Sequence, residues 1–324
     1  MFICGWCASG GLAMGLASSV IITAMTRHLH LDPFSGIAGD MFLGAMIDLS
    51  VPLAKLEAVL APLPVERPYR LTAERAFRCG VGGVDFKVHL EPATHASPAA
   101  HAHAQPTAAS EAGTHHDHHH HGHHHGDDHG HSQRAGHGDH HHDAPAHDRH
   151  QHHHHTGYRE IMAMIDQLDI AERGRDRARR IVTALGEAEA RVHGKPIEQV
   201  HFHEVGAVDS IVDMLGAAVA LEMLDVDTLS CGPLPISRGY VRCDHGLMPV
   251  PAPATAYLLE TLPTIGVDRT GELITPTGAA IVRALCDSLG PPPAMTFAKV
   301  GYGAGDRDDP AVPNLLRAVL GERR

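Results

Sequence analysis

Residues 27–49 read RHLHLDPFSGIAGDMFLGAMIDL, and this stretch decides the class of fold. Polar and apolar residues alternate over 27–31, which predicts a short β-strand with Leu29 and Leu31 on one face. The segment PFSGIAG at 33–39 predicts a turn, and the apolar residues beyond it recur at helical spacing from about Asp40. A strand, a turn and a helix in succession indicate a fold that mixes both kinds of element.

Strands and helices continue to alternate along the rest of the chain. Residues 71–91 predict two strands around a turn at 80–83, and residues 161–192 predict two amphipathic helices, the second of which ends at Gly194. A third helix over 208–224 is apolar almost all round and is therefore expected to be buried. With 33 Gly and 22 Pro, the chain is predicted to be α+β (mixed α/β) and loop-rich.

Histidine is concentrated in one part of the sequence, because 24 of the 31 His fall within residues 95–155. Residues 93–156 lack the large apolar side chains that would offset the entropy of ordering the backbone, so we expect a disordered His-rich insert. This insert would divide one globular domain into 27–92 and 157–322. Residues 1–26 are interpreted as an unstructured or mis-called amino-terminal extension.

Composition excludes several classes of function. A net charge of −12 and 4% aromatic residues argue against nucleic-acid binding, which needs clustered Lys and Arg or stacking rings. The apolar run over 12–25 is shorter than the roughly 20 residues of a membrane helix. The six Cys show no spacing typical of a small secreted domain. We therefore expect a cytoplasmic protein that binds neither nucleic acid nor membrane.

The segment HFHEVGAVDSIVD at 201–213 is the strongest candidate for a metal site. Two carboxylates four residues apart share a face of the buried helix, and no Lys or Arg within 197–237 could neutralise them. Imidazole and carboxylate together suit divalent ions. The alternative is that Asp209 caps the helix, Asp213 pairs with a distant Arg and the His residues only pack. The candidate metal ligands are His201, His203, Glu204, Asp209 and Asp213.

A second candidate site is the strand–turn–helix stretch itself. Asp32 ends the strand and Asp40 opens the helix, and such junctions gather ligands and anions in α/β folds. Ser35, Gly36 and Gly39 lie in the turn and could bind a cofactor, although the turn has neither a P-loop nor a G-x-G-x-x-G pattern. Equally, Asp40 could simply be the N-cap of the helix.

Three weaker candidates lie further along the chain. His245 adjoins a Pro-rich turn, where a core or surface role is more common than a catalytic one. TPTGAA at 275–280 predicts a helix start that could bind an anion or be a plain cap, through Thr275, Thr277 and Gly278. GYGAGD at 301–306 is predicted to be a Gly-rich loop of low specificity.

Five blocks together resemble the LarC family of nickel insertion proteins. They are LDPFSGIAGDMFLGAMIDL (31–49), VHGKPIEQVHFHEVGAVDSIVDMLGAA (192–218), HGLMPVPAPAT (245–255), GELITPTGAA (271–280) and KVGYGAGDRD (299–308). The resemblance runs from about Arg27 to Glu322, interrupted by the His-rich insert that such proteins often carry.

The resemblance implies a nickel insertase, a lyase similar to metal chelatases. Its substrate would be a dinucleotide-derived pyridinium thiocarboxylate, pyridinium-3,5-bisthiocarboxylic acid mononucleotide, in which Ni²⁺ becomes bonded to a ring carbon and two sulfurs. CTP would be split to CMP and pyrophosphate with Mn²⁺ or Mg²⁺ present. The 201–213 cluster could hold nickel, Asp32, Asp40 or His245 could take the ring proton, and the helix starts near Asp40 and Thr277 could take the phosphate.

The resemblance also implies partners. Complete LarC chains continue past the point matching Gly321 into a CTP-binding domain, so we expect a separate carboxy-terminal partner and no CTP cleavage by this chain alone. The product would pass to lactate racemase or a similar acceptor, and we expect a homo-oligomer.

Two other functions are compatible with the residues. The His-rich stretch could make the chain a nickel-storage protein or metallochaperone, because neutral imidazole binds nickel and copper well. A divalent-metal hydrolase built on the 201–213 cluster is a further alternative.

Overall fold

The structure, a computed structural model, describes residues 26–91, 156–202, 208–243, 245–307 and 309–323. These residues belong to one compact unit, whereas a second unit, residues 93–153, lies outside the described residues together with residues 1–25. The His-rich insert and the amino-terminal extension therefore stay predictions.

A mixed β-sheet forms one layer of this unit, and the described residues contribute seven strands to it in the order β2-β3-β10-β11-β1-β4-β9. β1 runs parallel to β4, and β4 to β9, whereas β11 is antiparallel to both β1 and β10. The carboxyl ends of β1, β4 and β9 therefore meet at one end of the sheet. The strands are β1 (Thr26–Asp32), β2 (Tyr69–Arg78), β3 (Val81–Leu90), β4 (Thr228–Cys231), β9 (Ser288–Leu289), β10 (Met295–Ala304) and β11 (Leu315–Arg323).

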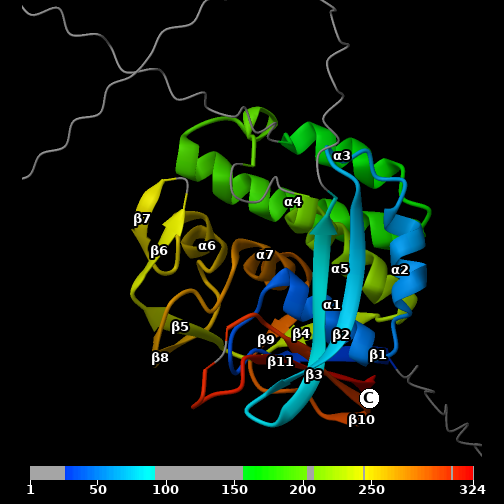
Figure 1. The fold of residues 1–324 in the computed structure, drawn as a ribbon, viewed down its shortest axis with the longest axis vertical. Helices are drawn as coiled ribbons and strands as arrows, with labels where there is room; N and C mark the ends of the chain where they lie inside the picture. The colour runs from blue at the N-terminus through cyan, green and yellow to red at the C-terminus, as the bar shows by residue number, and fades with distance from the viewer. Residues whose placement is uncertain (1–25, 92–155, 203–207, 244, 308, 324) are drawn as a thin grey trace, which may run out of the picture. The chain divides into compact units, whose positions relative to one another are not determined.

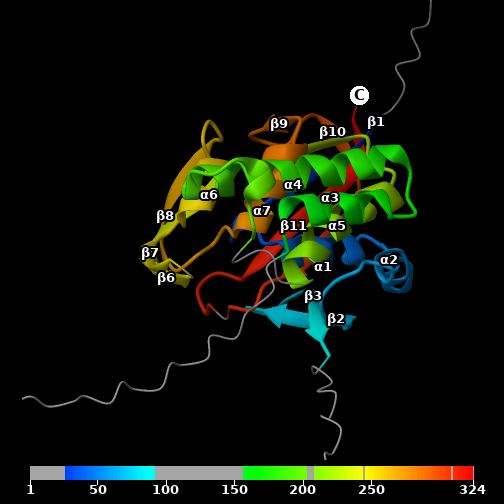
Figure 2. The ribbon, with the colours of Figure 1, turned by 90° about the horizontal axis from the view of Figure 1, so that it is seen from above.

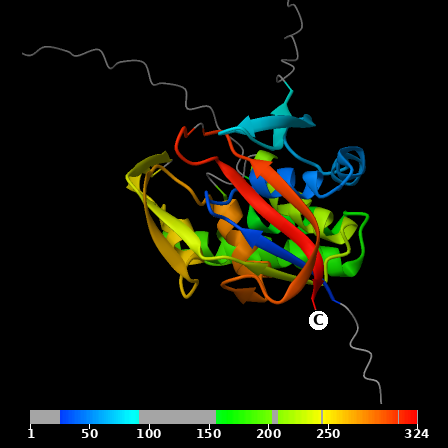
Figure 3. The ribbon, with the colours of Figure 1, turned by 90° about the horizontal axis from the view of Figure 1, so that it is seen from below.

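Helices cover one face of the sheet in two layers (Figures 1 and 2). Nearest the strands, α1 contacts β3, β10 and β11 and also packs on α5, while α4 lies over α5 and α7 in the outer layer. Figure 3 views the molecule from below, opposite to the view of Figure 2, and there β10, β11 and β1 lie in front of the helices. The helices are α1 (Gly39–Asp48), α2 (Leu53–Leu60), α3 (Tyr158–Asp166), α4 (Glu172–His193), α5 (Val208–Met223), α6 (Pro253–Leu258) and α7 (Pro276–Leu285), with a short 3₁₀ turn at Ile197–Gln199.

The helix patterns in the sequence correspond to the packing. α5 lies between α1 and α4 and buries nearly all its apolar residues, as its sequence predicted. α4 is amphipathic, burying its apolar side chains while its many Arg remain on the other face, and it ends at Gly194 in the left-handed conformation. The predicted mixture of strands and helices is confirmed.

Two further strand pairs lie beside the main sheet at the α6 side (Figure 1). β5 (Leu234–Arg238) pairs in parallel with β8 (Thr264–Thr270), and β6 (Tyr240–Cys243) forms an antiparallel hairpin with β7 (Gly246–Pro249). In the part of the chain that the structure describes, every helix is too short or too polar to cross a bilayer.

Two details of the sequence prediction were wrong. The hairpin turn between β2 and β3 is Cys79–Gly80 rather than 80–83, and both residues adopt positive φ, which suits a two-residue hairpin. The GYGAGD segment, predicted to be a loop, mostly belongs to β10. Its glycines permit close packing of α1, because a Cβ on Gly303 would lie 2.7 Å from the backbone nitrogen of Ala45.

Candidate functional site

A cavity of about 520 Å³ opens where the amino-terminal ends of α1, α5 and α7 meet the hairpin strand β6. We call it the carboxylate cavity. Helix amino termini present unpaired N–H groups and a partial positive charge, so three of them converging on one space favour anionic groups there. The lining residues are Ala38, Asp40, Asp209, Ser210, Asp213, Val241, Arg242, Cys243, Ala252, Glu272, Thr275, Pro276 and Thr277.

Backbone contacts hold two of these helix starts together. The N–H of Ile37 donates to the carbonyl of Leu273 (3.0 Å), and the N–H of Thr275 donates to the carbonyl of Ile37 (3.1 Å). Gly278 permits this approach, because a Cβ there would lie 2.7 Å from the carbonyl carbon of Ile37. The turn before α1 and the start of α7 are therefore one packed unit, although they are far apart in sequence.

Carboxylates form one wall of the carboxylate cavity. Asp209 and Asp213 lie one turn apart on α5, and Asp40 lies in the first turn of α1. Burial raises the pKa of Asp213 well above its usual range, and the neighbouring charges of Asp40 and Asp209 raise it further. Burial also raises the pKa of Asp40, against the opposing effect of Lys87. Asp40 and Asp213 therefore hold their protons more tightly than isolated carboxylates would, until a cation enters.

Lys87 supplies a positive charge that the local sequence around 201–213 lacks. Its ammonium lies 3.0 Å from Asp85 and 3.5 Å from Asp40, and it also contacts Asp306. Burial lowers the pKa of Lys87, but hydrogen bonds to Asp306 and Asp85 outweigh it, so the net pKa is raised and the ammonium stays charged. One cation thus balances only part of the acidic wall.

Other lining residues suit an anion, although Glu272 lies among them. Thr275 caps α7 by accepting a hydrogen bond from the N–H of Gly278 (3.2 Å), and Pro276 follows at the first helical position, as predicted. Thr277 places its hydroxyl 3.0 Å from that of Thr275, and Arg242 enters from β6. A phosphate or carboxylate could be held between this helix start and the guanidinium.

The structure brings together some of the predicted site residues. Asp40, Asp209, Asp213, Thr275 and Thr277 line the carboxylate cavity. Gly39 and Gly278 do not line it but adjoin lining residues, and Gly39 is so close to Asp213 that a Cβ would lie 2.5 Å from the Cγ of that aspartate. Asp40 is not the N-cap of α1, which is Ala38; its carboxylate accepts the N–H of Met41 instead.

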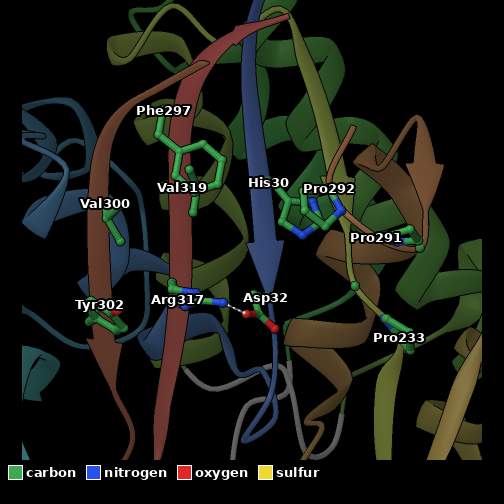
Figure 4. Close-up of a pocket in the computed structure, with 12 residues that line it drawn as sticks. His30, Asp32, Pro233, Pro291, Pro292, Phe297, Val300, Tyr302, Arg317 and Val319 are labelled. Atoms are coloured by element: carbon green, nitrogen blue, oxygen red, sulfur yellow. Dashed lines mark hydrogen bonds and ion pairs between the residues drawn. The ribbon is translucent and has the colours of Figure 1, made fainter. Parts of the chain in front are cut away.

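Other predicted residues lie elsewhere. Ser35 is buried and its hydroxyl accepts a hydrogen bond from Arg269 (3.0 Å), while Gly36 packs against the backbone of Leu273. Asp32 faces a different cavity and pairs with Arg317 (Figure 4).

The histidines of the candidate sites are only partly described. His245 is exposed on the β6–β7 hairpin, with its ring centroid 5.0 Å from that of His193. His201 is exposed and bridges to Gly157, whereas His203 and Glu204 lie outside the described residues.

A metal site made by the protein alone is not present in the described ranges, where no three His, Cys, Asp or Glu side chains are grouped closely enough to hold an ion. The five-ligand cluster predicted at 201–213 therefore stays a prediction. Asp40, Asp209 and Asp213 line the same cavity, but as they stand they are not grouped closely enough to hold one ion together, so an ion there would need further donors.

Sequence reasoning missed Lys87, Arg242 and Glu272. Lys87 lies on β3, more than a hundred residues from α5, and nothing in its local sequence separates it from any surface lysine. Glu272 precedes the TPTGAA motif, and Arg242 precedes the predicted His245, so both adjoin motifs that the sequence analysis singled out.

Comparison with known proteins relates the whole described chain to one family. Residues 29–324 match the family described as nickel insertion protein. The chain is 41% identical over 294 residues to a putative nickel insertion protein from Geobacter sp. (strain M21), covering 91% of this chain and 61% of that protein. It is 37% identical over 294 residues to the pyridinium-3,5-bisthiocarboxylic acid mononucleotide nickel insertion protein from Geobacillus kaustophilus (strain HTA426), covering 91% and 59% respectively.

The chain thus spans about 60% of the length of the curated relatives it matches. No solved structure matches it. The family match begins within β1 and continues through all the elements that surround the carboxylate cavity. On this evidence the chain belongs to the LarC family of nickel insertion proteins.

Proposed function

We propose that this chain carries out the nickel insertion step on pyridinium-3,5-bisthiocarboxylic acid mononucleotide, the compound named for the Geobacillus relative. The observation that carries the proposal is the carboxylate cavity. It brings three aspartates together with a helix start and an arginine around a volume of about 520 Å³ that can admit a mononucleotide.

The two walls match the two ends of such a substrate. The phosphate would lie at the start of α7, near Thr275, Thr277 and Arg242. The pyridinium ring would then face Asp40, Asp209 and Asp213, whose negative charge complements a cationic ring and a Ni²⁺ ion. The thiocarboxylate sulfurs would complete the coordination that the aspartates leave open, so the ion could leave the protein with its new ligand.

Carbon–nickel bond formation releases the ring proton, which a base must accept. Of the three candidates Asp32, Asp40 and His245, only Asp40 lines the carboxylate cavity. We therefore propose Asp40 as the base, with Lys87 positioned to stabilise the carboxylate before it takes the proton.

Dependence on CTP, with Mn²⁺ or Mg²⁺, remains part of the proposal. The relatives are longer than the matched region, and we propose that a carboxy-terminal part of that kind supplies CTP cleavage. The test is CMP release by this chain with Mn²⁺, alone and after addition of the carboxy-terminal portion of a relative. Robust CMP formation by the chain alone would contradict this division.

The insertion proposal is tested with Asp213→Asn, assayed with Ni²⁺, the pyridinium nucleotide, CTP and the carboxy-terminal portion. Product is measured by mass spectrometry. We expect no product, because the amide cannot provide the negative charge, while circular dichroism and thermal unfolding stay those of the native chain. The matched control is Asp268→Asn, whose carboxylate is exposed and pairs with Arg238 outside the cavity. Near-normal insertion by Asp213→Asn would refute the proposal.

A further inference from the structure

A second cavity, of about 280 Å³, lies on the face of the sheet opposite α1 and α5 (Figure 4). We call it the sheet-face cavity. Its floor is formed by β10, β11 and β1, and its rim by the segments that follow β4 and β9. Side chains alternate along β1, so His30 and Asp32 face this cavity while Leu29 and Leu31 face the helices.

The sheet-face cavity has apolar walls with charge at one end only. Phe297, Val300 and Val319 lie along the strands, and Pro291 and Pro292 lie across from them (Figure 4). Asp32 and Arg317 form an ion pair at the opposite end from Phe297. The Arg317 side chain is 45% exposed, so its guanidinium remains accessible, and it has more N–H donors than one carboxylate can use.

Tyr302 provides a polar group that hydrogen-bonds with Arg317, and His30 provides a second one in the side wall. His30 is only 4% exposed, and its Nδ1 lies 2.8 Å from the hydroxyl of Ser230. That hydroxyl also lies 2.7 Å from Nε2 of His28, whose Nδ1 lies 2.7 Å from the hydroxyl of Thr228. Within the described residues, Nε2 of His30 has no hydrogen-bond partner. This nitrogen is not one of the buried atoms left without a partner, so it is open to the cavity, where water or a ligand atom can hydrogen-bond to it.

We propose that the sheet-face cavity binds a small aromatic carboxylate, with the carboxylate on Arg317, the ring between Phe297 and Pro292, and a polar ring substituent on Nε2 of His30. This function is independent of nickel insertion. The site lies on the other face of the sheet, and it shares no lining residue with the carboxylate cavity.

Size and chemistry select this class of ligand. A volume of about 280 Å³ admits a single substituted ring but is small for a nucleotide. Flat apolar walls favour an aromatic ring, because rings stack on Phe and Pro faces. The guanidinium fork matches a carboxylate in two parallel hydrogen bonds, and a bound carboxylate would share Arg317 with Asp32.

The test uses 4-fluorobenzoate and 4-fluorobenzamide as probes, with ¹⁹F NMR titration of the full chain. We expect the benzoate to bind with a Kd of about 1 mM or tighter, as its size allows. The uncharged benzamide should bind about 10-fold more weakly, because it lacks the charge that strengthens hydrogen bonds to Arg317.

Two variants and two matched controls locate the binding. Arg317→Gln should weaken benzoate binding about 10-fold, and Phe297→Ala about 3-fold or more. Phe297 is 56% exposed, so its removal should leave the fold intact. Phe77→Ala removes an exposed ring from β2, and Arg323→Gln removes an arginine from the same strand as Arg317; neither residue lines the cavity.

The proposal requires that both controls keep the native affinity. Absence of any benzoate binding at 10-fold the expected Kd would overturn it, and so would equal affinity for benzoate and benzamide. Binding that survives in both Arg317→Gln and Phe297→Ala would show that the ligand lies elsewhere, which also overturns it.

Discussion

Gly39 lies so close to Asp213 that no residue with a side chain could take its place without a shift of the backbone. Gly39 begins α1, where alanine would ordinarily favour the helix by up to about 1 kcal/mol. A Cβ at this position, however, would lie 2.5 Å from both Cβ and Cγ of Asp213. The absence of a side chain at residue 39 therefore determines where the central carboxylate of the cavity lies.

Gly39→Ala is predicted to destabilise the protein by about 1–3 kcal/mol, because relief of the overlap must shift α1 or α5. Urea unfolding followed by circular dichroism measures the change. Gly266→Ala is the matched control, since no atom lies within 4 Å of a Cβ placed there. If Gly39→Ala were as stable as the native chain, or more stable, helix propensity would dominate and the close contact would be unimportant.

His28 and His30 make the stability of the protein depend on pH. Burial lowers the pKa of His28, as do the charges of Arg323 and His30, against Asp287. Burial likewise lowers the pKa of His30, with Asp32 opposing and Arg317 adding to the shift. The unfolded chain therefore takes up protons first as the pH falls below the ordinary histidine value of about 6.5.

The two histidines therefore do not lower the free energy of unfolding well above pH 6.5. As the pH falls below that value, the free energy of unfolding is predicted to decrease. Each histidine contributes a slope of at most about 1.4 kcal/mol per pH unit. In His28→Gln the fall between pH 6.5 and 5 should be smaller than in the native chain, as measured by urea titrations at each pH. His89→Gln, on the exposed end of β3, serves as control, and an identical slope in His28→Gln would exclude His28 as a source.

At the scale of elements, the carboxylate cavity exists because three helices begin at the same place. α1 follows β1 and α7 precedes β9, so both are fixed by the sheet, whereas α5 is fixed by packing on α1 and α4. The start of α7 is tied to the turn before α1 by backbone hydrogen bonds. The cap of α7 therefore affects both the stability of the helix and the anion-binding wall.

Thr275→Ala removes the side chain that accepts the N–H of Gly278 and should cost about 1 kcal/mol. Thr275→Ser retains the hydroxyl and should stay near the native stability. Thermal and urea unfolding measure both, and binding of inorganic phosphate to each variant reports on the anion wall. Equal stability of the alanine and serine variants would show that water replaces the cap without loss.

At the scale of the whole molecule, the hydrophobic core is formed by side chains of 26–91 and 156–323. The His-rich residues 95–155 lie outside the described residues, and their sequence holds no large apolar side chain that a core would need. Stability and nickel capacity should therefore be separable properties of this chain.

Replacing residues 95–155 by a flexible Gly-Ser linker is predicted to leave the urea midpoint nearly unchanged and to remove most of the bound nickel. The 24 imidazoles lost with this stretch bind nickel near neutral pH and release it as they become protonated below about pH 6. Calorimetry measures the stoichiometry of nickel binding before and after replacement. An insertase keeps activity at ample nickel after the replacement, whereas loss of insertion under those conditions would favour the storage function.

Much of the local structure could be predicted from the sequence. The periodicity of 41–49 and 208–224 is set by residue type alone, and both segments are helices close to the expected bounds. Thr275 and Pro276 are a helix start by their own chemistry, and the structure confirms it. The GYGAGD segment was mispredicted because glycines suit a loop as well as a strand that another backbone approaches.

The candidate site could be predicted only in part. Asp40, Asp209 and Asp213 stand in motifs with a visible spacing, so the sequence singles them out. Lys87 and Arg242 have no such pattern. Lys87 meets Asp40 only because β3 packs on α1 and α5, and Arg242 lines the cavity only because the β6–β7 hairpin is folded against it. The separation of Asp32 from Asp40 also follows from the fold, since alternation along β1 turns Asp32 to the other face of the sheet.

The sequence by itself determined the kind of elements, the family and the chemical types present at the site. These depend on neighbours along the chain, whose spacing sets helix and strand periodicity and whose motifs are contiguous. Tertiary structure alone decided which charges meet, because Coulomb interactions and desolvation act through space between residues such as Lys87 and Asp40. It likewise decided that Asp32 and Asp40, which are close in sequence, line two different cavities. The sheet separates the space on its two faces, and the sequence alone does not show which face each carboxylate meets.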